Sequence, residues 1–255
     1  MGATGNVGGA VVLGLLEHGE AVRAVSRQHQ DWPDGVTGVV ADPMQAGSLD
    51  AAAEGVDRAF VMSGYAAEAG LLSSLHEAHV VLLSASSAGL GVGDNPLARM
   101  HLESEHAVLA SGPPHTFLRP CSFQSNLLRW RDQLADGDVV RAPFADVPVA
   151  MVDPADIAAV AVVALTEPGH EGKVHRLSGP QALTPPEQVR LLGEALGRDL
   201  RLEEQPDEEG GAAGIDIFRH HADLESEVQD TVPSVLGRPA GPLAAWLDRN
   251  RNAFA

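Results

Sequence analysis

The first twelve residues, "MGATGNVGGAVV" (1–12), contain Gly2, Gly5 and Gly8 in G-x-x-G-x-x-G spacing. Glycines let backbone N–H groups approach a phosphate without a Cβ in the way, and a helix N-terminus adds a partial positive charge. This spacing is typical of the turn between a buried strand and a helix on which a dinucleotide's pyrophosphate rests. A plain structural turn is the alternative, since the chain has 27 glycines.

The residues after this turn favour a helix followed by alternating strands and helices. Val11, Val12, Leu15 and Leu16 recur at helical spacing, and Gly19 is a suitable C-terminal stop. Short apolar runs predict strands at 21–27, 35–43, 58–64, 79–87, 115–120 and 173–179. Further helices are predicted at 48–57, 66–78, 95–112, 122–137, 153–169, 184–197 and 240–254.

Three of these helices begin with recognisable caps. Ser48 is a predicted N-cap, and Asp153 is another, followed by Pro154 at the first helical position. Thr184 and Glu187 have capping-box spacing around Pro185. The acidic stretch at 203–214 is predicted to be a loop.

Alternating strands and helices indicate a parallel sheet covered on both faces. We therefore expect an α/β fold, a doubly wound and mostly parallel Rossmann sheet with a smaller C-terminal substrate lobe. The expected division is a dinucleotide-binding domain at 1–125 and the lobe at 126–255. Some segments at about 150–180 are expected to pack back on the sheet.

Composition narrows the classes of partner. A formal net charge of −18 repels phosphate backbones, so no nucleic acid is expected. Cys121 is the single cysteine, which excludes an internal disulfide and fits the cytoplasm. The longest apolar run, 157–165, is too short to span a bilayer, and no signal peptide is visible. A small-molecule partner remains, and the sequence does not predict an oligomeric state.

Two charged residues follow the first two predicted strands. Arg27 suits the 2′-phosphate of NADP, whereas an acid there would prefer NAD. NADPH is therefore the expected cofactor rather than NADH, and a solvated surface arginine is the alternative. Asp42 could accept a hydrogen bond from the adenine amino group, or it could be a turn aspartate.

Several segments in this order resemble the NmrA-like group of atypical short-chain dehydrogenases. They are "GATGNVGG", "VRAVSR", "VVADP", "FVMSG", "HLESEHAVLASGPPHTFLRP", "SFQSN", "DPADIAAVAVVAL" and "GKVHRLSGP". The group includes NADPH-dependent quinone reductases, a triphenylmethane-dye reductase and non-catalytic redox-sensing regulators. The 16 arginines against one lysine further suggest a GC-rich bacterial genome.

The resemblance implies a cofactor-binding role for a set of residues in this chain. The pyrophosphate would be lined by the turn, the adenosine phosphate by an arginine, adenine by an acid, and the two riboses and nicotinamide by later strand ends. In that order these residues are Gly2, Thr4, Gly5, Asn6, Val7, Arg27, Asp42, Ser63, Gly64, Ser84, Ala85, Cys121, Ser122 and Phe123.

The chain departs from the family pattern at its start. Members begin with a strand of four or five apolar residues before the glycine turn, and here only Met1 precedes Gly2. In the family's sheet that strand is central, between the second and fourth strands. Without it we expect a buried gap and two open strand edges, and we take a start within a longer chain as a hypothesis.

The usual catalytic pair of short-chain dehydrogenases is also missing. Tyr-x-x-x-Lys cannot be present, because the single tyrosine, Tyr65, lies more than a hundred positions from the single lysine, Lys173. Alcohol oxidation or sugar epimerisation by that pair is therefore excluded.

His101 and Tyr65 are the candidate catalytic residues. His101 lies where related reductases keep a lysine or histidine, and could hold the nicotinamide ribose or donate a proton. Its alternative is a structural hydrogen bond to Glu105, four residues on. Tyr65 follows a strand and could stack on substrate or be a loop aromatic. Phe123 and Trp130 could wall a flat ring or pack in a core, and no metal site is expected.

These observations favour an NADPH-dependent oxidoreductase that transfers hydride to a planar, electron-poor molecule such as a quinone. Such a reduction needs orientation and exclusion of water more than a protein acid, since solvent can supply the proton. The alternative is a regulator that senses NAD(P) and binds a protein partner without turnover, and a third possibility is an inactive remnant.

Overall fold

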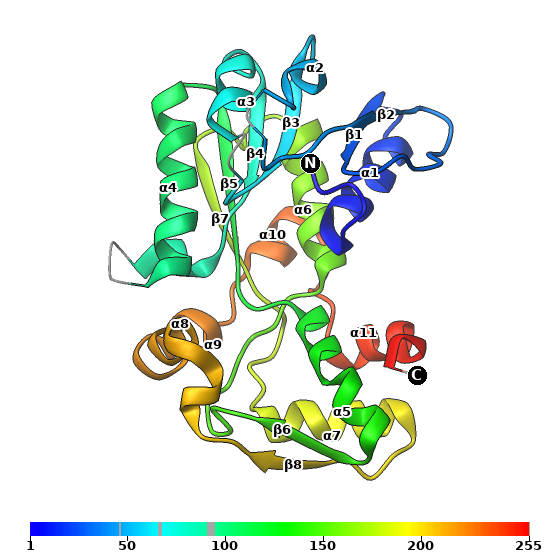
Figure 1. The fold of residues 1–255 in the computed structure, drawn as a ribbon, viewed down its shortest axis with the longest axis vertical. Helices are drawn as coiled ribbons and strands as arrows, with labels where there is room; N and C mark the ends of the chain where they lie inside the picture. Colours follow the sequence, from blue (N-terminus) through cyan, green and yellow to red (C-terminus); the bar gives the residue numbers. More distant parts are fainter. Residues whose placement is uncertain (46, 66–67, 91–94, 255) are drawn as a thin grey trace. The chain divides into compact units, whose positions relative to one another are not determined.

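The computed structural model describes residues 1–45, 47–65, 68–90 and 95–254. Chain contacts divide it into two compact units, one of residues 1–92, 98–119 and 157–175, and one of residues 93–97, 120–156 and 176–255. Parallel strands alternate with helices along the first unit (Figure 1), so the predicted α/β class is confirmed.

The first unit holds most of the predicted strands and helices. Its elements are α1 (Asn6–Glu17), β1 (Val22–Ser26), β2 (Val36–Val40), α2 (Asp50–Ala53), β3 (Arg58–Met62), α3 (Glu68–Ser74), β4 (His79–Leu83), most of α4 (Pro96–Ser111), β5 (His115–Pro120), most of α6 (Pro154–Thr166) and the start of β7 (Lys173–Leu177). Residues 66 and 67, where the prediction began the α3 helix, lie outside the described residues.

The strands of the first unit form two separate sheets. One has the order β3-β4-β5-β7, and the other contains only β1 and β2. Val80, Val81 and Leu82 of β4 are fully buried, which is typical of a strand covered on both faces. The core around β3 and β4 includes Leu72 of α3 and Val108 of α4.

A cavity of about 430 Å³ is lined by most residues of β1 and β3, the strands at which the two sheets end. Val22, Ala24, Phe60 and Val61 are among the apolar residues that line it. At its end the Met1 ammonium donates a hydrogen bond to the Phe60 carbonyl, at 2.6 Å. The expected gap and the two open strand edges are therefore present in the structure.

The helix that opens the chain packs closely within the first unit. A Cβ on Gly14 of α1 would lie 2.8 Å from Cγ2 of Val162 in α6, so the two helices touch at a position where a side chain is not tolerated without a shift.

The Ser48 prediction is wrong, because Leu49 is the N-cap of α2 and the Ser48 hydroxyl donates to the Asp42 carbonyl.

The second unit has its own apolar core, with Leu127, Trp130, Leu192 and Leu247 almost fully buried. Its elements are α5 (Arg131–Asp136), β6 (Val139–Ala142), α7 (Pro185–Leu196), β8 (Arg201–Glu204), α8 (Gly211–Ile215), α9 (Ala222–Ser226), α10 (Thr231–Leu236) and α11 (Leu243–Asn250). The Thr184–Glu187 capping box at the start of α7 is confirmed.

Three predictions in this unit are corrected. The segment 122–137 is a 3₁₀ turn, Gln124–Trp130, followed by α5 rather than one helix. The acidic stretch 203–214 is not a loop, since it contains the end of β8, a 3₁₀ turn and most of α8. The predicted helix at 240–254 is shorter, because α11 ends at Asn250 and a 3₁₀ turn follows. Pairing of β6 with β8 was not predicted, because both strands have four residues and β8 is mostly polar.

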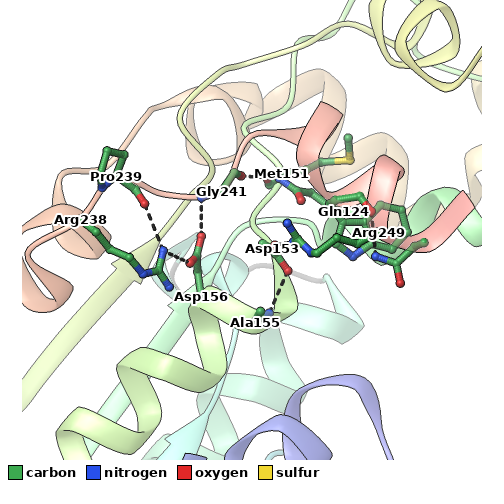
Figure 2. Close-up of polar contacts among 11 residues, drawn as sticks. Gln124, Met151, Asp153, Ala155, Asp156, Arg238, Pro239, Gly241 and Arg249 are labelled. Atoms are coloured by element: carbon green, nitrogen blue, oxygen red, sulfur yellow. Dashed lines mark hydrogen bonds and ion pairs between the residues drawn. The ribbon is translucent and has the colours of Figure 1, made fainter. Parts of the chain in front are cut away.

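Two buried carboxylates at the start of α6 bind the C-terminal part of the second unit (Figure 2). Asp156 pairs with Arg238 at 2.7 Å and accepts the Gly241 N–H at 2.6 Å. Asp153 pairs with Arg249 and caps the helix by accepting the Ala155 N–H at 2.9 Å. The predicted cap at Asp153 is confirmed, and the same carboxylate has a second, tertiary partner.

An Asp156→Asn variant is expected to lose about 2 kcal/mol of unfolding free energy, since it removes the charge from a buried pair whose arginine is half exposed. Urea unfolding followed by circular dichroism measures the change. Asp199→Asn is the control, because the Asp199 side chain is 93% exposed. Equal midpoints for the two variants would contradict this role of Asp156.

Candidate dinucleotide-binding site

The glycine turn adopts a conformation that needs glycine at two positions. Gly2 has a φ of +66°, which side chains disfavour. A Cβ on Gly8 would lie 2.1 Å from the Gly2 carbonyl oxygen. The Gly5 N–H donates to that same oxygen at 2.9 Å, so the turn closes tightly on itself. The conformation of the turn therefore requires glycine at positions 2 and 8.

The start of α1 is open to an anion. The Gly9 N–H donates to the Gly5 carbonyl, which leaves the amides of Asn6, Val7 and Gly8 as the N-terminal donors of the helix. Thr4, Gly5 and Asn6 are exposed and the first turn has no acidic residue. Open donors, a positive helix end and glycines at close approach fit the pyrophosphate of a dinucleotide.

The turn lies beside the carboxyl end of β3. A Cβ on Gly2 would meet the Met62 sulfur at 2.3 Å, and Met62 is the last residue of that strand. Ser63 follows, and both its N–H and its hydroxyl donate to the Leu83 carbonyl at the end of β4. Ligands of parallel α/β sheets bind at this edge, so the predicted strand-end residues of the first unit share the expected location.

Arg27 and Asp42 follow the neighbouring strands β1 and β2, which are joined there by the Ala41 N–H and the Ser26 carbonyl. Arg27 is exposed and forms no ion pair with any residue that the structure describes. Asp42 accepts the Met44 N–H at 3.0 Å and the Gln45 amide at 3.2 Å. Its carboxylate therefore holds a local turn, as the alternative interpretation stated.

Gly64 and Tyr65 complete the segment after β3. Gly64 has a φ of +86°, donates to the Ser104 hydroxyl at 3.1 Å, and leaves no room for a Cβ beside the Met100 sulfur. Tyr65 is half-buried, and its hydroxyl has no hydrogen bond within the described part of the chain. The Gly64 backbone is therefore fixed against α4.

Ser84 and Ala85 follow β4, and Ser84 is buried. Its hydroxyl donates to Glu105 of α4 at 2.6 Å. Arg119, near the end of β5, donates to the same carboxylate at 2.9 Å and 2.5 Å. Ser84, the residue predicted to lie near the nicotinamide ribose, is therefore hydrogen-bonded to the Glu105–Arg119 ion pair, which was not predicted from the sequence.

His101 lies one helical turn before Glu105 and is half-buried. Its Nδ1 is buried and has no hydrogen-bond partner among the residues that the structure describes. Burial lowers the pKa of His101, and the charge of Glu105 opposes this in part. Among the described residues the Glu105 oxygens accept from Arg119 and Ser84, and none accepts from His101. A buried ring nitrogen without a partner marks His101 as a candidate for contact with a ligand.

In the second unit, Cys121, Ser122 and Phe123 follow β5. The Ser122 N–H and hydroxyl both donate to Glu225, at 2.8 Å each, and Cys121 donates to the Leu224 carbonyl. Burial raises the pKa of the Cys121 thiol to about 12, so it is a poor nucleophile. Trp130 is buried in the core, which favours packing over a substrate wall.

Sequence reasoning missed Glu225 because it lies 103 residues after Ser122 and outside every quoted motif. Within the described residues, no three His, Cys, Asp or Glu side chains meet in a way that could hold a metal ion. Nor is any described helix long and apolar enough to cross a bilayer.

Comparison with known proteins decides the family. The profile of a family described as NAD(P)H-binding matches residues 2–168. The chain belongs to this NAD(P)H-binding family. A reductase of Streptomyces griseus, named for (4-alkanoyl-5-oxo-2,5-dihydrofuran-3-yl)methyl phosphate, is 36% identical over 276 residues, covering 100% of this chain and 98% of the relative. An NAD(P)H azoreductase of Xenophilus azovorans is 32% identical, covering 100% and 98%.

Solved structures of the NAD(P)H-binding fold give the same architecture. The NADPH-dependent quinone oxidoreductase of Escherichia coli, complexed with NADPH, has a TM-score of 0.79 at 24% identity, covering 98% of each chain. The triphenylmethane reductase of Citrobacter sp. also has a TM-score of 0.79 at 24% identity, covering 97% of this chain and 96% of its own. At this identity the likeness shows the fold alone.

Proposed function

We propose that the chain is a reductase that uses NADPH to deliver hydride to a planar, electron-poor small molecule such as a quinone. The observation that carries this is the glycine turn before α1, which lies beside the carboxyl end of β3, with open helix donors and no room for a Cβ at Gly8. Three relatives support the class, since their names describe reduction of a dihydrofuranone phosphate, an azo compound and a quinone.

The proposed cofactor contacts follow the chain order. Gly2, Thr4, Gly5, Asn6 and Val7 bind the pyrophosphate with backbone N–H groups and short side chains, and the exposed Arg27 binds the 2′-phosphate. Residues at later strand ends serve the rest of the molecule: Asp42 for adenine, Ser63 and Gly64 for the adenosine ribose, Ser84 and Ala85 for the nicotinamide ribose, and Cys121, Ser122 and Phe123 for the nicotinamide.

NADPH, when bound, supplies a hydride with its electron pair to an electron-poor carbon or nitrogen of the acceptor. A proton from water would complete the reduction, because this reaction does not require a protein acid. The lowered pKa keeps His101 mostly neutral near pH 7, so it holds its partner by a hydrogen bond rather than by charge. Tyr65 supplies a face on which a flat acceptor can stack.

An Arg27→Ala variant is expected to weaken NADPH binding about 10- to 100-fold, because one charge-assisted contact to a phosphate contributes roughly 1.5–3 kcal/mol. NADH binding should change less than about twofold, since NADH lacks the 2′-phosphate. Titration by nicotinamide fluorescence measures both affinities. Arg201→Ala is the control, with an exposed arginine removed from β8 of the other unit.

The outcomes separate the proposals. An equal loss of affinity for NADPH and for NADH would show that Arg27 does not bind the 2′-phosphate. Tight NADPH binding without oxidation by any quinone, azo or triphenylmethane acceptor would favour the non-catalytic sensor. If neither nicotinamide binds, enzyme and sensor both fail.

A further inference from the structure

A buried ion pair joins three elements of the first unit. The Glu105 side chain in α4 is 3% exposed, and its two oxygens accept from Arg119 Nε at 2.9 Å, Arg119 Nη2 at 2.5 Å and the Ser84 hydroxyl at 2.6 Å. Arg119 holds the carboxylate with both arms of its guanidinium, the geometry that gives the most directional pairing. The hydrogen bond to Glu105 raises the pKa of Arg119.

Stability alone does not explain why this ion pair is buried. Burying a carboxylate carries a large desolvation penalty, and a well-packed apolar replacement is often as stable or more so. What an ion pair supplies in addition is a fixed geometry. Here it fixes the carboxyl ends of two adjacent parallel strands, because Ser84 follows β4 and Arg119 lies near the end of β5.

Helix α4 also positions two candidate site residues, Gly64 and His101. Ser104 precedes Glu105 and accepts the Gly64 N–H after β3, and His101 lies on the Glu105 face one turn earlier. The Ser84 hydroxyl, committed to Glu105 as a donor, keeps its lone pairs to accept from a ligand. The chain's contacts therefore run from β3 through α4 to β4 and β5, with Glu105 at the junction of the last two.

We propose that Glu105 is a positioning residue of the reductase site: it joins the ends of β4 and β5 to α4 and so sets where Ser84 and His101 meet the nicotinamide half of the cofactor. This rests on the proposed function. The pyrophosphate and 2′-phosphate contacts lie elsewhere, on the glycine turn and Arg27, so Glu105 should affect the reaction rather than the anchoring of NADPH.

The test replaces Glu105 by glutamine and by aspartate. Glu105→Gln keeps the shape and removes the charge, whereas Glu105→Asp keeps the charge and withdraws it by one methylene. With NADPH and a quinone, both should lower kcat at least tenfold while KM for NADPH changes less than about threefold. Glu103→Gln is the matched control, one exposed carboxylate on the same helix, and should leave kcat within twofold.

A second readout does not depend on turnover. The His101 ring is followed by NMR as pH is varied, with its signal assigned from a His101→Asn variant. Glu105→Gln should lower the pKa of His101 further, because the charge that opposes the burial effect is lost and Arg119 is left uncompensated. Glu105→Asp should lower it less than Glu105→Gln does, and should also fold more readily, because Arg119 keeps a partner.

The outcomes are distinct. A folded Glu105 variant with kcat within twofold of the unaltered chain and an unchanged His101 titration would overturn the inference. If the unaltered chain reduces no acceptor, the proposed function fails. The His101 titration alone then decides whether Glu105 controls the environment of the His101 ring. If Glu105→Gln does not fold, the Glu105→Asp kcat and KM decide.

Discussion

A Gly8→Ala variant should bind NADPH at least 100-fold more weakly, and should lose roughly 1–3 kcal/mol of stability. Its Cβ would lie 2.1 Å from the Gly2 oxygen, 2.6 Å from the Gly2 carbonyl carbon and 3.1 Å from the Met1 oxygen. All three are backbone atoms, so relief requires moving the turn away from the start of α1. A 100-fold loss corresponds to about 2.7 kcal/mol of binding free energy.

Fluorescence titration with NADPH measures the affinity, and urea unfolding measures stability. Gly70→Ala serves as the control, because a Cβ at Gly70 in α3 meets no atom within 4 Å and alanine has the better helix propensity. Should Gly8→Ala bind NADPH within threefold of the unaltered chain, the turn is not the phosphate site.

Adding five apolar, strand-forming residues before Met1 should stabilise the fold by on the order of 3–6 kcal/mol. The added segment would fill the cavity between β1 and β3 and pair with both strand edges. Each buried aliphatic side chain contributes about 1.5–3 kcal/mol and each net hydrogen bond about 1 kcal/mol, against roughly 1–2 kcal/mol per ordered residue. The NADPH affinity should rise as well, since the glycine turn gains a fixed base.

The extension also removes a buried amino group that can be protonated. Burial lowers the pKa of the Met1 ammonium from 8.0 to about 6, so protonation favours the unfolded chain and stability falls as pH drops from 8 through 6. An amide in its place should reduce that dependence. Urea midpoints at pH 6 and pH 8 test both effects. A glycine–serine extension of equal length is the control, and equal midpoints for the two extensions would refute strand pairing in the cavity.

The strands and the helix caps were predictable because they are local. Val80 to Leu83 form a continuous apolar run, which is the pattern of a strand buried on both faces. Thr184 and Glu187 satisfy each other three residues apart, so the start of α7 needs no distant partner. The Ser48 cap failed for the converse reason, since its hydroxyl bonds instead to Asp42, six residues away.

By itself the sequence determined the glycine turn, the position of most strands along the chain and the absence of Tyr-x-x-x-Lys, because spacing and counting suffice for each. Only the tertiary structure decided the partners of the charged groups. Glu105 accepts hydrogen bonds from Arg119 and Ser84, and Glu225 holds Ser122 from 103 residues away. Buried charged groups need hydrogen-bond partners. Which partner lies near depends on how the strands pair rather than on distance along the sequence.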